Sequence, residues 1–360
     1  MNLSKIPATV VTGFLGSGKT TLLSNIIKQS KGKRIAIIVN EFGEMDIDSD
    51  LLRSCAIEGC EENNNEVTLL EDGIYELPNG CICCTVEEEF LPVMKKLVER
   101  RDEIDHVLIE TSGLALPKPL VQAFNWPDVQ NHFTVDSVIT VVDGPALSDG
   151  RFAHSHEQIE TQRQADNSLN HDPSIQELFE DQLGAADLII ISKNDLVDDD
   201  KRQVIEEKLR AQLNDSVKIL SIENGEINPD LILGLEAASE DRIESLHSHH
   251  DHHHEHDKHH HHAHDDFDSI VVKLGIVDND NLLQQLDSVI KSQNIYRAKG
   301  FVALENKPMR QVVQAVGARV EHYFDRPWRA DETPCTEIVL IGKQLNVEQI
   351  KTALKTAELS

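Results

Sequence analysis

Short runs of consecutive apolar residues recur through the first part of the chain. Many of their side chains are β-branched and few alternate with polar ones, which is typical of strands buried on both faces of a parallel sheet. The runs are PATVVTG (7–13), IAIIV (35–39), HVLIE (106–110), VITVVD (138–143) and LIIISKND (188–195). Helical spacing lies between them, as in Leu22, Leu23, Ile26 and Ile27. This alternation predicts an α/β fold with a mostly parallel sheet, flanking helices and right-handed crossovers.

The pattern changes near residue 240. Residues 240–266 have almost no apolar side chains and hold 12 of the 18 histidines, so they cannot bury a core and are predicted to be a linker or loop. Strand patterns at 267–275, 295–305, 318–328 and 336–343, with helical patterns at 281–292 and 347–356, predict a small C-terminal α+β domain. We therefore expect a large domain over 1–240, a His-rich acidic linker over 241–266 and the small domain over 267–360.

Acidic residues outnumber basic ones, 63 to 34, which gives a net charge of −29. A chain of this charge does not attract nucleic acid or anionic lipid, so any phosphate must be held by a local site. The N-terminus has too short an apolar stretch for a signal peptide, and no apolar run approaches the length of a membrane span. We expect a cytoplasmic protein without nucleic-acid or membrane partners, and the pattern leaves its oligomeric state open.

The segment GFLGSGKT (13–20) follows a predicted strand, opens a predicted helix and fits the pattern G-x-x-x-x-G-K-[ST]. Its glycines let backbone amides face a triphosphate, and the helix N-terminus adds its dipole. Lys19 would reach the β- and γ-phosphates, and the Thr20 hydroxyl would bind Mg²⁺. The predicted nucleotide-binding residues of this segment are Gly13, Gly16, Ser17, Gly18, Lys19, Thr20 and Thr21.

Two later segments complete the predicted nucleotide site. In HVLIETSG, Glu110 ends a strand, where its carboxylate can hold Mg²⁺ through a water or orient the attacking water. The Gly113 amide can contact the γ-phosphate. In SKND (192–195), Asp195 would accept two hydrogen bonds from guanine and the Lys193 stem would lie over the base, which favours GTP. The predicted catalytic residues are Glu110 and Lys19.

Three of the six cysteines fall within four residues, in the segment CICC (81–84). The thiolates of Cys81, Cys83 and Cys84 suit Zn²⁺, Cu⁺ and, in tetrahedral geometry, Co²⁺. Three ligands leave a fourth position open, which suits a metal that is passed on better than one held for structure. The segment NEFGEMDID (40–48) follows another predicted strand, and Glu41 is a further candidate ligand.

The histidine tract interleaves imidazoles with Asp and Glu. Each imidazole is a competent ligand for Zn²⁺, Co²⁺ or Ni²⁺, so the composition predicts weak, multi-site metal collection. The alternative is a solvated spacer. No single histidine is assigned.

Five segments occur in order along the chain: GFLGSGKTTLL, NEFGE, NGCICCTV, IETSGLALPKPL and SKND. Together they resemble the CobW family of P-loop GTPases, which act as metallochaperones, and the likeness covers nearly the whole chain. Stretches such as VDSVITVVDGPAL and RPWRADE are similar to the branch that serves cobalamin biosynthesis. The chain departs from the guanine-recognition pattern at Ser192, where Asn is usual.

The resemblance implies a GTP hydrolase whose C-x-C-C cysteines bind metal when GTP and Mg²⁺ order the switch segments. Hydrolysis would then release the metal to a client metalloenzyme, which for the cobalamin branch is a cobaltochelatase that receives Co²⁺. Zn²⁺ is the alternative cargo, because it outcompetes Co²⁺ at thiolate sites when both are equally available. A passive metal store and a thiol oxidoreductase using Cys83 and Cys84 also stay open, although adjacent cysteines form strained disulfides.

Overall fold

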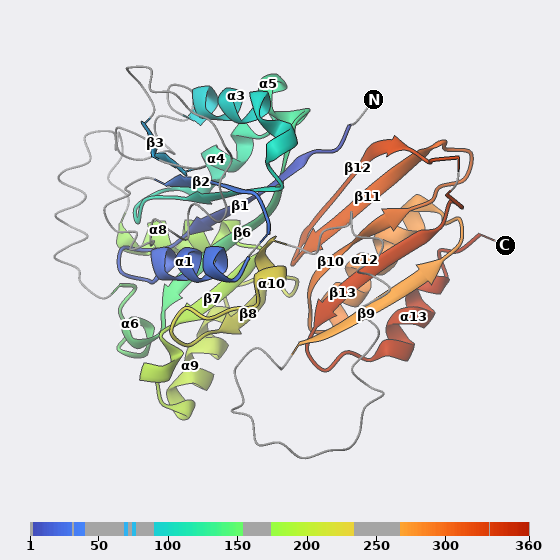
Figure 1. The fold of residues 1–360 in the computed structure, drawn as a ribbon. Helices are drawn as coiled ribbons and strands as arrows, with labels where there is room; N and C mark the ends of the chain where they lie inside the picture. Colours follow the sequence, from blue (N-terminus) through green and yellow to red (C-terminus); the bar gives the residue numbers. More distant parts are fainter. Residues whose placement is uncertain are drawn as a thin grey trace, which may run out of the picture. The chain divides into compact units, whose positions relative to one another are not determined.

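The computed structural model describes residues 3–30, 32–39, 90–153, 174–233, 267–330 and 332–359, together with the backbone of 68–70 and 74–76. The chain divides into two compact units, Lys5–Pro229 and Met1–Ser4 with Asp230–Ser360. The first is built on a mostly parallel sheet and the second on an antiparallel one (Figure 1). The expected linker over 241–266 lies outside the described residues, so its boundaries stay predictions.

The first unit contains an eight-stranded sheet in the order β3-β4-β2-β5-β1-β6-β7-β8. Neighbouring strands are parallel except for β3 and β4. The strands are β1 (Ile6–Thr12), β2 (Ile35–Val39), β3 (Thr68–Leu70), β4 (Ile74–Glu76), β5 (His106–Glu110), β6 (Phe133–Asp143), β7 (Leu188–Ser192) and β8 (Lys218–Ser221). The predicted α/β fold class is thus confirmed, and each of the five apolar runs coincides with a strand or overlaps one.

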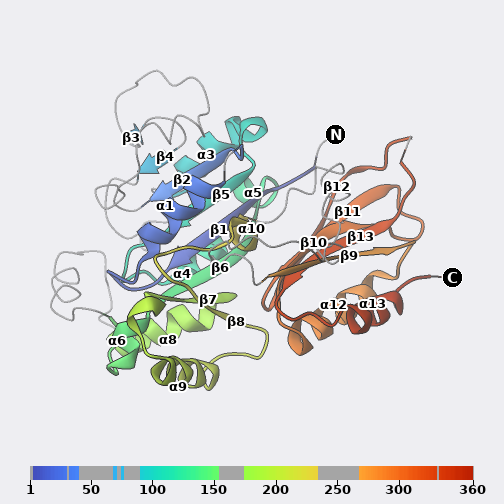
Figure 2. The ribbon, with the colours of Figure 1, turned by 60° about the horizontal axis from the view of Figure 1, so that its bottom comes forward.

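Helices cover this sheet and bury its apolar side chains. They are α1 (Lys19–Gln29), α3 (Leu91–Glu99), α4 (Pro117–Ala123), α5 (Pro127–Gln130), α6 (Gly144–Ser148), α8 (Ile175–Ala185) and α9 (Asp199–Arg210). One core cluster joins β1, β2, β5 and β6 to α3, α4 and α5. A second joins β7 and β8 to α8 and α9, with α6 packed beside α9 (Figure 2). Apolar burial of this extent is the main driving force for the fold.

The parallel direction of the strands determines where a site can form. Because β1, β2, β4, β5, β6 and β7 run the same way, their carboxyl ends lie at one edge of the sheet. Ligands of open α/β sheets bind at this edge, in the loops that follow the strands. The segments after β1, β5 and β7 are those in which the sequence predicts the nucleotide site.

The outermost strand β8 carries a buried lysine. Lys218 is 6% exposed, and burial lowers the pKa of its ammonium, with the nearby Arg210 acting in the same direction. Both effects have the same sign because burial and a neighbouring positive charge each disfavour the charged form. No strand was expected at 218–221, because the run is short and begins with this lysine.

The second unit is a five-stranded antiparallel sheet in the order β12-β11-β10-β13-β9, with α12 and α13 packed against its apolar core. Its elements are β9 (Asp268–Leu274), α12 (Asn279–Ser292), β10 (Ile295–Val302), β11 (Met309–Val316), β12 (Arg319–Pro327), β13 (Thr336–Gly342) and α13 (Val347–Lys355), and the short α10 (Pro229–Leu233) begins where the two units divide. The sequence pattern predicted each of these except α10 and β11. In β11 the apolar pattern is interrupted by polar side chains that are nevertheless buried: Arg310 pairs with Asp325 at 2.5 Å and stacks on Phe301.

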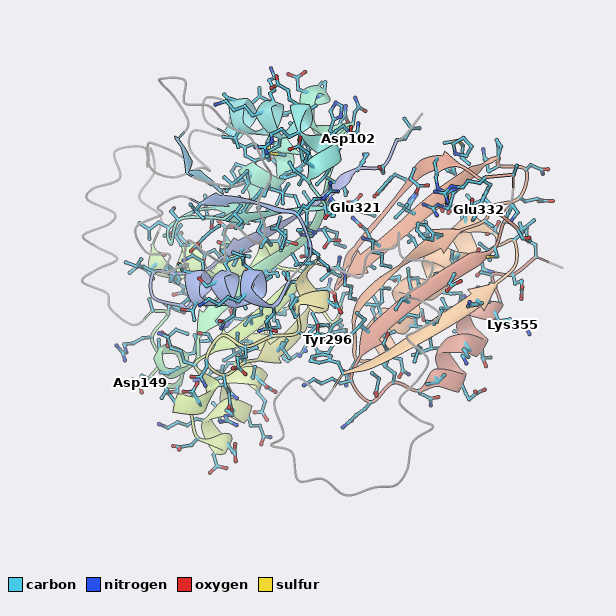
Figure 3. The ribbon with its side chains drawn as sticks, in the orientation of Figure 1. Asp102, Asp149, Tyr296, Glu321, Glu332 and Lys355 are labelled. Atoms are coloured by element: carbon cyan, nitrogen blue, oxygen red, sulfur yellow. The ribbon has the colours of Figure 1, made fainter. Side chains whose placement is uncertain are left out.

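Glu332, labelled in Figure 3, closes a second ion-pair cluster in this unit. Its carboxylate accepts hydrogen bonds from both Nη atoms of Arg326, at 2.6 and 2.5 Å, and from the backbone N–H of Arg329 at 2.8 Å. The bonds from Arg326 are the largest cause that lowers the pKa of Glu332 from 4.5 to about 2. A carboxylate held in this way stabilises the folded state only while it is ionised.

We expect this cluster to make stability depend on pH. The folded pKa of Glu332 lies below the unfolded one, so its contribution is present above pH 4.5 and is lost as the pH falls toward about 2. Glu332→Gln should lower the free energy of unfolding by about 2 kcal/mol at pH 6, and the difference from wild type should shrink steadily below pH 4.5. Urea unfolding at several pH values measures this, with exposed Glu305→Gln as control. A difference that stays constant with pH would refute the assignment.

Candidate functional site

The loop between β1 and α1 turns sharply against the sheet. Gly13, Gly16 and Gly18 have φ angles of 136°, 74° and 96°, a region that residues with side chains rarely adopt. At Gly13 space is also lacking, because a Cβ there would lie 2.2 Å from the carbonyl oxygen of Val141 on β6. The loop therefore holds its shape only with glycine at position 13.

The start of α1 is arranged for an anion. Gly18 caps the helix without a side-chain hydrogen bond, and the first turn contains no acidic residue. Lys19 is 6% exposed, and its Nζ donates to the carbonyl oxygens of Gly13 at 2.9 Å and Phe14 at 3.2 Å. The buried Ser17 hydroxyl has no hydrogen-bond partner among the described residues. Uncapped amides, a buried cation and an unpaired hydroxyl at one helix N-terminus fit a phosphate group.

Thr20 and Glu110 meet at the carboxyl ends of β1 and β5. The Thr20 hydroxyl donates to Glu110 Oε1 at 2.9 Å, and Glu110 is 8% exposed. A hydroxyl and a carboxylate are hard oxygen donors, the type that Mg²⁺ prefers. The two residues that the sequence predicts for the magnesium are thus in contact, and the donor set fits that ion. Gly113, also predicted, is buried in the loop between β5 and α4, three residues beyond Glu110.

The segment after β7 is hydrogen-bonded to the glycine-rich loop between β1 and α1, which we call the phosphate loop. Ser192 Oγ donates to the carbonyl oxygen of Ser17 at 2.6 Å, so Ser at this position still bonds the phosphate loop where Asn is usual. Lys193 Nζ donates to the carbonyl oxygen of Gly16 at 2.7 Å. Lys193 has a positive φ of 54° and precedes a short helix, Asn194–Leu196, on which Asp195 is exposed. The predicted base-reading carboxylate therefore stands at the surface beside the phosphate loop.

Asp143, which the sequence analysis did not single out, also belongs to this site. It ends β6, is 1% exposed and lies opposite Ser192 in the β6–β7 register. Its Oδ2 forms an ion pair with Lys193 Nζ at 2.6 Å, and its Oδ1 accepts from the backbone N–H of Ala146 at 2.8 Å, which caps α6. The sequence signal was available, since an Asp at the end of an apolar run, followed by glycine and proline as in DGP (143–145), marks a helix start after a strand.

The predicted metal ligands Cys81, Cys83, Cys84 and Glu41 lie outside the described residues, as does the histidine tract. Among the residues that are described, no group of three or more His, Cys, Asp or Glu side chains could hold a metal ion. Within the same residues, none of the helices combines the length and apolarity needed to span a membrane. The cargo site stays a prediction from the sequence.

Comparison with known proteins adds a family context. Residues 7–221 match the family described as CobW/HypB/UreG, nucleotide-binding domain, and residues 268–358 match the cobalamin synthesis protein cobW C-terminal domain. The chain is 46% identical to the zinc chaperone CobW of a Sinorhizobium species over 342 residues, covering 95% of this chain and 94% of the relative. It is 48% identical to the zinc chaperone CobW of Pseudomonas aeruginosa over 355 residues, covering 99% and 92%. Identity to the Escherichia coli zinc chaperone YjiA is 29%, covering 98% of each chain.

The geometry predicts a specific effect for Asp143→Asn. The amide keeps an oxygen that can cap α6 but removes the charge that fixes Lys193, so a fluorescent guanine nucleotide should bind about five- to tenfold more weakly. The matched control is Asp149→Asn at the other end of α6, where the carboxylate pairs with Arg151 on the surface. Equal affinities of Asp143→Asn and wild type would show that nucleotide binding does not depend on the charge of Asp143.

Proposed function

The chain belongs to the CobW/HypB/UreG family of nucleotide-binding proteins, and from this we propose that it is a GTP-hydrolysing metallochaperone that delivers Zn²⁺ to a client metalloprotein. The proposal is supported by relatives named zinc chaperones that align over nearly the whole length of both chains. Its main structural support is that three parts of the site lie at one edge of the sheet. These are the phosphate loop between β1 and α1 (residues 13–18), the pair of Thr20 and Glu110 that would hold Mg²⁺, and the base loop after β7 (residues 192–195).

Each contact of the site has a role in binding GTP. The Lys19 ammonium would leave the carbonyl oxygens of Gly13 and Phe14 for the β- and γ-phosphates, which offer a stronger, charged acceptor. Thr20 and Glu110 would hold Mg²⁺, which supplies a positive charge beside the phosphates. Glu110 would also orient the attacking water, and the Gly113 amide would contact the γ-phosphate.

Guanine selectivity would come from Asp195 and Lys193. The Asp195 carboxylate would accept the N1 and N2 hydrogens of guanine, a donor pair that adenine lacks. The Lys193 stem would cover the base while its ammonium stays tied to Gly16 and Asp143. Because Lys193 belongs to the base loop and bonds the phosphate loop, this one lysine would support the recognition of both the base and the phosphates.

The topology gives the metal site a route to the nucleotide. Strands β2 and β4 end at Val39 and Glu76, at the same edge of the sheet as the phosphate loop. Glu41 follows Val39 by two residues and Cys81 follows Glu76 by five. A five-residue stretch spans at most about 18 Å, which is the upper limit on the distance between Cys81 and the end of β4. This connectivity supports the proposal that metal binding by the cysteines is coupled to the binding and hydrolysis of GTP.

A nucleotide-ordered segment is a two-state element that is released when the γ-phosphate leaves. If Cys81, Cys83 and Cys84 form a tight metal site only in the ordered state, GTP must raise metal affinity and metal must raise GTP affinity by the same factor. Hydrolysis would then lower metal affinity and allow transfer. A reducing compartment such as the cytoplasm keeps the three thiols available as ligands.

Cobalt is the second candidate cargo. It is favoured by the match of residues 268–358 to a cobalamin synthesis domain, with a cobaltochelatase as client. The names of the relatives and the higher intrinsic affinity of Zn²⁺ for thiolates favour zinc. Both cargoes use the same mechanism, so one experiment can separate them.

The decisive measurement is a competitive titration of Zn²⁺ and Co²⁺ under anaerobic, reducing conditions, with Mg²⁺–GTP, with Mg²⁺–GDP and without nucleotide. We expect Mg²⁺–GTP to raise metal affinity at least about tenfold, with Zn²⁺ bound more tightly than Co²⁺. Lys19→Ala should abolish the effect of GTP, and Cys83→Ser should abolish the tight site in every nucleotide state.

The controls in this titration also separate a chaperone from a store. A passive store would bind metal with one affinity in all three nucleotide conditions, and Lys19→Ala would bind it like wild type. That result would overturn the proposal. Tighter binding of Co²⁺ than Zn²⁺ with GTP would leave the mechanism intact and reverse the cargo.

The base loop yields a second prediction. Asp195 is exposed, and its replacement disturbs no buried contact among the described residues, so Asp195→Asn should fold like wild type. It should bind GTP about a hundredfold more weakly and gain affinity for xanthosine triphosphate, because Asn offers a donor where xanthine has an acceptor. Nucleotide competition measures both changes. If Asp195→Asn keeps its preference for GTP, the base is read elsewhere.

A further inference from the structure

Gln182 is a fully buried amide in the second half of α8, at 0% exposure. Its Nε2 lies 3.2 Å from the carbonyl oxygen of Gly113 and 3.2 Å from that of Ala115, and donates to both. Both acceptors belong to the buried loop between β5 and α4. One side chain from a distant helix thus holds two alternate peptide groups of the loop that follows Glu110.

The backbone of Gln182 is fixed as well. Its carbonyl oxygen accepts a hydrogen bond from Thr140 Oγ1 at 2.8 Å. Thr140 lies on β6, fully buried, and pairs with Thr12 at the end of β1, directly before the phosphate loop. Gln182 therefore links the strand beside the phosphate loop to the Gly113 loop by hydrogen bonds on both sides.

If this position only filled the core, an apolar side chain would be more favourable there than an amide. The other buried side chains of this helix include Leu178, Phe179 and Leu183, which pack in an apolar cluster. Gln182 Oε1 is buried and has no hydrogen-bond partner among the described residues, which is unfavourable in such surroundings. The donor atom Nε2 is what the position provides, and its two bonds go to the loop that carries Gly113.

We propose that Gln182 is a positioning residue for GTP hydrolysis, which holds the Gly113 loop in the conformation that contacts the γ-phosphate. This inference rests on the proposed GTPase function and adds a residue to it. Fixing the carbonyl groups of Gly113 and Ala115 fixes the planes of the peptides that follow them, because each peptide unit is rigid. The preceding peptide, which carries the Gly113 N–H, is held within the same loop by the N–H of Ala115, which donates to the carbonyl oxygen of Ser112 at 3.1 Å. A loop fixed before the nucleotide arrives has less conformational freedom to lose when it contacts the γ-phosphate.

The test compares Gln182→Met with wild type. Met is close to Gln in size but cannot donate to Gly113 or Ala115. We expect the affinity for a non-hydrolysable GTP analogue and kcat for GTP hydrolysis each to fall about tenfold or more. The affinity for GDP should stay within about twofold of wild type, because GDP lacks the phosphate that the loop contacts. A loss of general stability would instead weaken both nucleotides alike.

Two further variants keep the test sharp. Asp181→Asn removes the exposed pair with Lys118, which joins α4 to α8 one residue away, and should leave the ratio of the two affinities unchanged. Thr140→Val removes the hydroxyl that holds the Gln182 backbone, and should change the ratio in the same direction by a smaller factor. Thr140→Val also carries the test if Gln182→Met does not fold.

The outcomes separate this inference from the proposed function. If wild type neither binds nor hydrolyses GTP, the proposed function fails and takes the role of Gln182 with it. If wild type binds and hydrolyses GTP, and Gln182→Met keeps the wild-type ratio of the two affinities and the wild-type kcat, the inference alone is overturned. If Gln182→Met does not fold, the same result for Thr140→Val overturns the inference. Selective loss of the GTP analogue in Gln182→Met, with Asp181→Asn unaffected, supports it.

Discussion

Residue 13 lies so close to β6 that a Cβ there would be 2.2 Å from the carbonyl oxygen of Val141, so only glycine fits. This close approach brings the loop after β1 against β6. The base loop can then bond the loop after β1. Ser192 donates a hydrogen bond to the carbonyl oxygen of Ser17, and Lys193 donates one to that of Gly16. The two loops are thus joined by hydrogen bonds, and the buried carboxylate of Asp143 holds Lys193 in place through an ion pair. A larger residue at position 13 would separate all of these contacts together.

Much of the fold follows from local pattern, and two of the exceptions, β8 and β11, have a common physical cause. Strands such as β2 and β7 consist almost entirely of consecutive apolar residues, and burial on both faces is the reason. β11 and β8 were missed because they bury charged side chains, Arg310 and Lys218, and a pattern of apolar residues cannot reveal a cation that is buried. Arg310 is accommodated by Asp325, a partner fifteen residues away that only the sheet brings near.

The site divides in the same way. Lys19, Thr20 and Glu110 are predicted from the sequence, because their motifs tie residue type to a strand end or a helix start, and the structure brings Thr20 and Glu110 into contact. The sequence marks Asp143 as the start of a helix, but neither its pairing with Lys193 nor the contacts of Gln182 could be assigned, since each partner is brought near by tertiary structure. Asp143 meets Lys193 through the parallel register of β6 and β7, and Gln182 meets the Gly113 loop across a helix–loop contact. Residues proposed to bind the nucleotide are marked by motifs, whereas residues that hold others in place are marked by packing.

The two outer strands of the eight-stranded sheet bear on how the protein behaves when crowded. An open sheet ends in unpaired backbone groups, which can recruit a strand from another molecule and begin aggregation. At one end β3 is only three residues long and runs against its neighbour, so it offers a short template. At the other end a new strand on β8 would remove Lys218 from its remaining water, and burial already makes its charge unfavourable. A buried lysine on the last strand therefore disfavours the addition of a further strand at that edge.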